Sequence, residues 1–131
     1  MDKKINQAVI RIPCNLQEFF FYWVKFLKAL HNLTEREIQV AAELLLERYE
    51  ISKTLEDPNF IDTVLLSPES KTKIREKVGI TVQHFNCVYK RLKEVKIIVN
   101  NNQINKRFIP KLYPNENNFN LTLFFEFDIC K

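Results

Sequence analysis

The chain has 131 residues, 46% of them hydrophobic and 12% aromatic, and a formal net charge of +4 at pH 7. This length suits a single domain with its own core, and the apolar content excludes a disordered tail. No apolar run is long enough to span a membrane, no secretory signal opens the chain, and three widely spaced cysteines predict reduced thiols, so we expect a cytoplasmic protein.

The N-terminal part of the chain predicts a short strand followed by a very apolar helix. Residues 8–12 alternate between apolar and polar side chains, as in a half-buried strand. Asn15 and Glu18 then form a partial capping box for a helix that runs to about Leu30. Because this helix is apolar almost all round, we expect the surface of residues 19–30 to pack partly on a second copy or on another protein subunit.

The next helix begins with a strong signal. Thr34 and Glu37 have the spacing of a capping box, and hydrophobic residues on either side have the spacing of a hydrophobic staple. We expect this helix to end near Ile51. Residues 52–66 follow as a looser connection, in which residues 59–66 are either helical or extended.

Residues 67–98 predict two helices joined by a tight turn. Ser67 and Pro68 are a favoured cap and first helical residue. Gly79, the only glycine in the chain, follows the end of this helix, where a left-handed backbone is favoured. Thr81 caps the second helix, whose apolar positions recur with 3-4-3 spacing and therefore share one side.

After this helix the apolar pattern changes to alternation. Residues 96–99 predict a strand, asparagines 100–102 a turn, and residues 104–112 a returning strand. Residues 113–120 are rich in proline and asparagine and predict an irregular segment. Residues 121–129 alternate sharply, which predicts a terminal strand that contacts another protein subunit through its edge.

The order helix, helix, Gly-Ile-Thr turn, helix and β-hairpin across residues 34–112 resembles a winged helix-turn-helix domain. The segment LTEREIQVAAELL resembles the first helix of many bacterial regulators, and VGITVQHFNCVYKRLKEVKII resembles the helix-turn-helix of that family. The chain length predicts a single domain over residues 1–131, and the resemblance implies that its fold class is α+β, mainly α. Residues 1–33 would add the strand and the apolar helix, and residues 113–131 a C-terminal strand extension. The chain departs from the family in its glycine-free wing tip and in these terminal additions.

Positive charge is concentrated in the part of the chain that carries this resemblance. Residues 67–111 have a net charge of +8, whereas residues 1–66 and residues 112–131 each have a net charge of −2. Such a basic region predicts phosphate binding, with an ordinary solvated basic face as the alternative.

The resemblance implies that the second helix of the motif lies in the major groove of double-stranded DNA. Glutamine and asparagine can hold adenine with two hydrogen bonds, so this helix carries side chains suited to reading bases. The residues expected to contact bases are Gln83, His84, Asn86, Tyr89 and Lys90. The residues expected to reach phosphates are Lys71, Lys73, Arg75, Lys77, Arg91 and Lys93, with Lys106 and Arg107 on the wing.

The sequence offers no support for catalysis, a metal or a cofactor. It has no glycine-rich phosphate loop, nucleophile elbow or paired-carboxylate motif. His84 and Cys87 have a spacing compatible with a metal, but no further ligands accompany them.

We therefore predict a non-enzymatic DNA-binding protein, a small transcriptional regulator. The Asn/Lys/Ile-rich, glycine-poor sequence resembles those of bacteriophages and mobile elements, which would place the protein in the host-cell cytoplasm. The alternative is a phage virion assembly protein, such as a head–tail connector or ring component, that uses the winged-helix scaffold for protein contacts.

Overall fold

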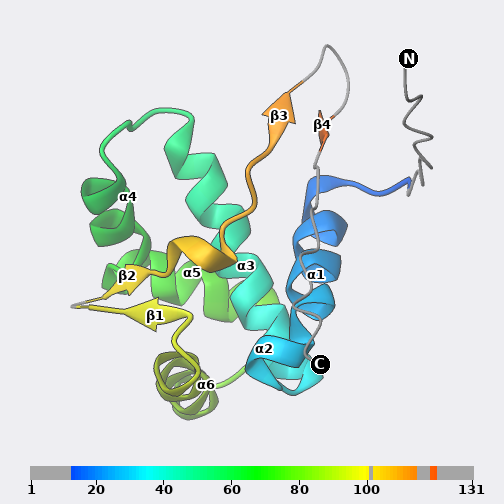
Figure 1. Ribbon diagram of the computed structural model, residues 1–131. Helices are drawn as coiled ribbons and strands as arrows, with labels where there is room; N and C mark the ends of the chain where they lie inside the picture. The colour runs from blue at the N-terminus through cyan, green and yellow to red at the C-terminus, as the bar shows by residue number, and fades with distance from the viewer. Residues whose placement is uncertain (1–12, 101, 115–118, 121–131) are drawn as a thin grey trace, which may run out of the picture.

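The computed structural model describes residues 13–100, 102–114 and 119–120. Its helices are α1 (Leu16–Phe26), α2 (Lys28–His31), α3 (Glu35–Ser52), α4 (Pro58–Leu65), α5 (Pro68–Val78) and α6 (Val82–Glu94). They are followed by β1 (Ile98–Val99), β2 (Gln103–Ile104), the 3-10 helix η1 (Lys106–Phe108), β3 (Tyr113–Pro114) and β4 (Phe119–Asn120). The described part is thus mainly helical with short antiparallel strand pairs, β1 with β2 and β3 with β4, which confirms the expected mainly α class (Figure 1).

The predicted helix starts are confirmed at the level of single hydrogen bonds. The capping boxes at Asn15 and Thr34 are both formed. Ser67 and Thr81 cap α5 and α6 by accepting hydrogen bonds from backbone N–H groups of the first turn. Asp57 does the same for α4, so the segment that the sequence left as helical or extended is a helix.

Helix α3 lies at the centre of the fold and contacts α1, α4, α5 and α6 (Figure 1). A single cluster of buried apolar side chains extends from Phe20 in α1 to Phe108 in η1. The N-terminal helix and the region expected to form a winged-helix core therefore share one hydrophobic core. The most fully buried of its large side chains are Leu33, Val40, Leu44, Leu65, Ile74, Val88 and Leu92.

The helix expected to run unbroken to Leu30 is interrupted at Leu27, where α1 ends and the short α2 begins. The break turns His31 into the core, although the sequence suggested no partner for it. The Leu33 N–H donates to His31 Nδ1 at 2.9 Å, so the proton lies on Nε2, which donates to the Val24 carbonyl at 2.8 Å. His31 thus links the end of α1 to the start of α3.

The returning strand expected over residues 104–112 is wrong beyond Ile104. Asn105 caps η1 by accepting a hydrogen bond from the Arg107 N–H at 3.1 Å. Trp23 in α1 donates from Nε1 to the Phe108 carbonyl at 2.8 Å. The cap at Asn105 and the hydrogen bond from Trp23 therefore stabilise η1 where the alternating pattern predicted a strand. The preference of a segment for the strand conformation depends strongly on its surroundings.

The β1–β2 hairpin is fastened to α4 through a buried carboxylate. Asp62 accepts a hydrogen bond from Arg48 Nε at 2.8 Å and another from the Ile104 N–H at 3.2 Å. Gln103 also donates to the Asn59 side chain at 2.8 Å. These contacts hold the hairpin beside α4 on one side, while β1 contacts α6 on the other.

The predicted strands over residues 8–12 and 121–129 lie outside the described residues. Within residues 113–120, expected to be irregular, the backbone of β3 pairs with that of β4. No described helix is both long and apolar enough to cross a membrane.

Candidate functional site

The turn between α5 and α6 sets the direction in which α6 leaves the core. Gly79 has a left-handed backbone with φ +77°, as predicted for the residue after a helix end. The N–H groups of Gly79 and Ile80 both donate to the Arg75 carbonyl, at 2.9 and 3.3 Å. Ile80 is then buried, and α6 follows with Phe85 and Leu92 facing the core.

The opposite side of α6 carries a row of polar side chains that we call the α6 stripe, formed by Gln83, Asn86, Lys90 and Lys93. All four are exposed and recur with 3-4-3 spacing, so they lie along one face. Gln83, Asn86 and Lys90 form no hydrogen bond or ion pair with any other described residue. Their donors and acceptors therefore remain available to a partner molecule.

Other side chains of α6 flank this stripe. His84 is exposed, as expected, and Cys87 is exposed as well. Arg91 forms an ion pair with Glu94 at 3.4 Å, which engages part of its guanidinium within the helix. Val82, the first residue of α6, is 57% exposed. The sequence analysis missed it because an apolar residue next to a helix cap ordinarily suggests packing.

The prediction that Tyr89 is an exposed base-contacting residue is wrong. Its side chain is only 9% exposed, with its ring stacked on Phe85 at a centroid distance of 6.2 Å. Its hydroxyl donates to Asn102 Oδ1 at 2.9 Å, which ties α6 to the hairpin turn. Burial raises the pKa of the Tyr89 hydroxyl. Tyr89 follows Phe85 by four residues, and this spacing already placed it at the edge of the apolar face.

Two of the predicted phosphate contacts on α5 are engaged within the protein. Lys73 forms an ion pair with Glu47 of α3 at 3.1 Å. Arg75 donates from Nη1 to the Ile80 carbonyl at 3.2 Å. Lys77 is exposed near the end of α5. These contacts leave a smaller basic surface than the sequence count alone suggested.

Lys71 and Lys93 instead gather on the Tyr89 ring. Their Nζ atoms lie 4.2 and 4.9 Å from the ring centroid. Burial, and then the neighbouring Lys93 charge, lower the pKa of Lys71. The fold therefore brings two of the predicted phosphate contacts together at the junction of α5, α6 and the hairpin turn.

Lys106 and Arg107, expected on a strand of the wing, lie on η1. Both are exposed. The Phe108 carbonyl of η1 accepts the hydrogen bond from Trp23 of α1. The structure thus attaches these two cations to the segment that returns toward α1, and not to the paired strands of the hairpin.

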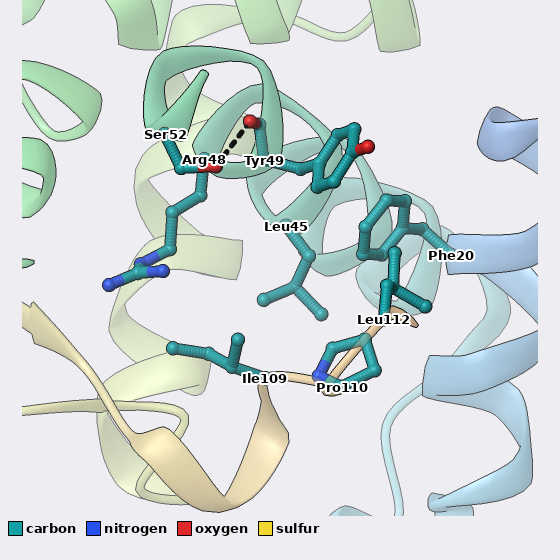
Figure 2. Close-up of a pocket in the computed structure, with 8 residues that line it drawn as sticks. All are labelled: Phe20, Leu45, Arg48, Tyr49, Ser52, Ile109, Pro110 and Leu112. Atoms are coloured by element: carbon teal, nitrogen blue, oxygen red, sulfur yellow. Dashed lines mark hydrogen bonds between the residues drawn. The ribbon is translucent and has the colours of Figure 1, made fainter. Parts of the chain in front are cut away.

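A small pocket of about 230 Å³ lies between α1, α3 and the segment after η1. Apolar side chains make most of its lining, and Arg48 extends its guanidinium away from Phe20 (Figure 2). That guanidinium pairs with Asp62 at 2.8 Å. The pocket contains none of the residues predicted to bind DNA, and its lining residues are Phe20, Leu45, Arg48, Tyr49, Ser52, Ile109, Pro110 and Leu112.

Among the described residues, no group of three or more histidines, cysteines or carboxylates is arranged to hold a metal ion. The geometry of α6 and its surroundings therefore makes the exposed stripe and the adjacent lysine pair the candidate site. Comparison of the chain with protein-family models, with curated proteins and with solved structures finds no match.

Proposed function

We propose that this chain is a DNA-binding protein of the winged helix-turn-helix type, acting as a small regulator of a phage or mobile element. Helix α6 would enter the major groove of double-stranded DNA with Gln83, Asn86 and Lys90 against the base edges and with Lys93 toward the phosphates. The observation that carries this proposal is that Gln83, Asn86 and Lys90 are exposed along one face without partners among the described residues.

The chemistry of the α6 stripe is compatible with base recognition. The side-chain amides of Gln83 and Asn86 can each donate to adenine N7 and accept from its N6 amino group. Val82 adds exposed methyl groups beside them, and such groups can contact the methyl group of thymine. We infer a preference for A·T pairs beneath the first turns of α6.

The position of α6 also supports the proposal. Its apolar side is anchored in the core by Phe85, Val88 and Leu92, so the exposed face is held on a rigid element. The β1–β2 hairpin lies beside it and is fixed in turn by Asp62. A helix and a neighbouring hairpin can then approach one duplex together.

Selection from a random duplex library followed by fluorescence anisotropy tests this function. The wild-type protein should select a site with an A·T core. The Gln83→Ala and Asn86→Ala variants should each bind that site roughly 5- to 150-fold more weakly, because each loses a bidentate contact. Gln39→Ala on α3 is the matched control and should bind as the wild type does. Equal affinity of all four proteins for every duplex would contradict the proposal.

A second candidate function is assembly of a phage structure, such as a connector or ring. It is favoured by apolar side chains that α1 and α2 leave on the surface. Tyr22 and Phe26, four residues apart on α1, are 46% and 54% exposed, and Leu30 on α2 is 58% exposed, so we call these three residues the apolar row. A groove of about 450 Å³ between α1, α3 and α5 adjoins this row at Tyr22.

Sedimentation velocity over a wide concentration range tests the assembly function. A discrete oligomer should form in the wild type and should dissociate when Tyr22 and Leu30 are both replaced by serine. Replacing the exposed residues Thr63 and Thr72 by serine provides the control, because these residues lie on α4 and α5. A wild-type protein that remains monomeric at every concentration would exclude this candidate.

A further inference from the structure

Two ammonium groups that come from different helices lie close to the ring of Tyr89. Lys71 belongs to α5 and Lys93 to α6, and both Nζ atoms are within cation–π range of this one ring, at 4.2 and 4.9 Å from its centroid. Tyr89 is buried, stacks on Phe85 of the same helix and donates a hydrogen bond from its hydroxyl to Asn102 of the hairpin turn. The aromatic platform is therefore fixed, and it brings two cations to one point on the surface.

No carboxylate among the described residues forms an ion pair with either of these two cations. Neither Lys71 nor Lys93 forms an ion pair with a described residue, whereas Lys73 and Arg91 on the same two helices do. The two ammonium groups repel each other, and this repulsion adds to burial in lowering the pKa of Lys71. An anion placed between them would relieve that repulsion.

A third donor belongs to the hairpin turn. Asn102 has a left-handed backbone with φ +64°, and its Oδ1 accepts the hydrogen bond from the Tyr89 hydroxyl at 2.9 Å. This bond orients the side-chain amide, and its Nδ2 group donates no hydrogen bond to another described residue. The α5, α6 and hairpin elements thus each contribute one N–H donor around Tyr89, and the tyrosine hydroxyl already has its acceptor.

We propose that Lys71, Lys93 and Asn102 form a phosphate-binding site that is organised by Tyr89 and that takes one backbone phosphate of bound DNA. A tetrahedral phosphate offers several oxygens to three separate donors, and charge-assisted hydrogen bonds from ammonium groups are strong. This inference rests on the proposed function, because it assigns the phosphate at which the hairpin turn and α6 would contact the same DNA strand. Tyr89 is a positioning residue here and does not touch the DNA.

The experiment replaces each backbone phosphate of the selected duplex in turn by an uncharged methylphosphonate. One position should weaken binding of the wild-type protein by about tenfold or more, as expected for loss of a hydrogen-bonded charge. The Lys71→Gln/Lys93→Gln double variant should bind the unmodified duplex more weakly and should be insensitive to the substitution at that position. Its slope of log affinity against log salt should also be reduced by at least about one.

The matched control is Lys53→Gln, which removes an exposed lysine at the end of α3. It should keep the methylphosphonate profile and the salt slope of the wild type. Tyr89→Phe keeps the ring and removes the bond to Asn102, so it should reduce sensitivity at the same phosphate position without creating a new one. A double variant with the same methylphosphonate profile as the wild type would overturn the inference, while the proposed DNA binding would stand.

Inorganic phosphate distinguishes a backbone phosphate from a free ion. In NMR titrations with phosphate, resonances of the Tyr89 ring and of Lys71 should shift in the wild type and should not shift in the double variant. If these resonances shift but no duplex binds, the three residues bind free phosphate. The assignment of the site to a DNA phosphate and the proposed DNA-binding function would then both be wrong. If no resonance shifts and no methylphosphonate position depends on the lysines, the site itself is excluded.

Discussion

Helix α6 and the pair α1–α2 each bury one side and expose the other, but the exposed sides differ in chemistry. On α6 the exposed row consists of amides and ammonium groups, whereas on α1–α2 it consists of Tyr22, Phe26 and Leu30. Exposed polar side chains form hydrogen bonds with water and need no protein partner. Several exposed apolar side chains close together are unfavourable in water, and such patches often mark interaction sites. Within the described residues, the exposed side chains of these two parts of the molecule therefore differ in polarity.

The buried sides of the same elements follow a common rule. Leu92 on α6 and Phe20 on α1 both enter the single core around α3. The difference between the two surfaces is therefore not a difference in how firmly the helices are held. The two surfaces differ in the side chains that point away from the core. The substitutions below separate the contribution of the buried side chains to stability from that of the exposed side chains.

The largest effect is expected at the junction of α2 with α3, where two leucines three residues apart have opposite environments. Leu33 is 1% exposed, and Leu33→Ala should lower the free energy of unfolding by about 2–5 kcal/mol through lost burial and a cavity. Leu30→Ala should change it by less than about 0.5 kcal/mol. Urea unfolding followed by circular dichroism measures both. Similar losses in the two variants would mean that Leu30 contributes to the stability of the fold as a buried side chain does.

A smaller effect is expected from the bond between α1 and η1. Trp23→Phe keeps most of the buried ring but removes the N–H that bonds the Phe108 carbonyl. The unfolding free energy should fall by about 1–3 kcal/mol, because a buried acceptor loses its partner. Tyr22→Phe, at the neighbouring exposed position, is the control and should be close to neutral. Equal stability of Trp23→Phe and the wild type would show that α1 does not hold η1.

The ends of α5 and α6 should respond in opposite directions to substitution. Gly79→Ala should cost about 1 kcal/mol through left-handed strain alone, because an added Cβ meets no atom within 4 Å. Lys96, after α6, has φ +68°, so Lys96→Gly should raise the unfolding free energy by a similar amount, about 1 kcal/mol. Thermal unfolding at one pH compares the pair. A loss of stability in Lys96→Gly would contradict the assignment of strain to this residue.

The smallest effects concern alkaline pH. The pKa of Lys71 is lowered in the folded state, so with rising pH the folded chain releases this proton first and stability rises. The pKa of Tyr89 is raised in the folded state. Above pH 10.0, the ordinary pKa of tyrosine, this hydroxyl therefore loses its proton first in the unfolded chain, and the free energy of unfolding falls. Lys71→Gln should therefore steepen the alkaline fall in urea midpoint, and Tyr89→Phe should reduce it. Unchanged pH profiles in both variants would rule out these contributions.

Local signals in the sequence were enough to place most helices. The caps at Asn15, Thr34 and Thr81 and the left-handed Gly79 depend on residues within a few positions, and the structure confirms all of them. The exposure of Gln83, Asn86 and Lys90 followed from helical periodicity alone. The function predicted from that exposure stays a proposal.

The candidate site was only partly accessible from the sequence. Counting charges assigned Lys71, Lys73 and Lys93 to the same role, but the fold pairs one of them with Glu47 and brings the other two onto Tyr89. Tyr89 itself was assigned to the exposed side. Its spacing from Phe85 places it at the edge of the apolar face of α6, and only the structure shows the hydrogen bond that ties its hydroxyl to Asn102 in the hairpin turn.

The sequence by itself determined where helices begin, which faces turn inward and where the chain needs a left-handed residue, because these properties depend on steric and hydrogen-bonding preferences over one or two turns. The break at Leu27, the burial of His31 and the end of β2 became visible only in the structure. The hydrogen bonds of the His31 ring and the cap of η1 join residues within seven positions of each other, whereas the hydrogen bond from Trp23 to the Phe108 carbonyl joins segments 85 residues apart. Such long-range contacts have no local signature, since the free energy that favours them is gained only when the whole core forms around α3.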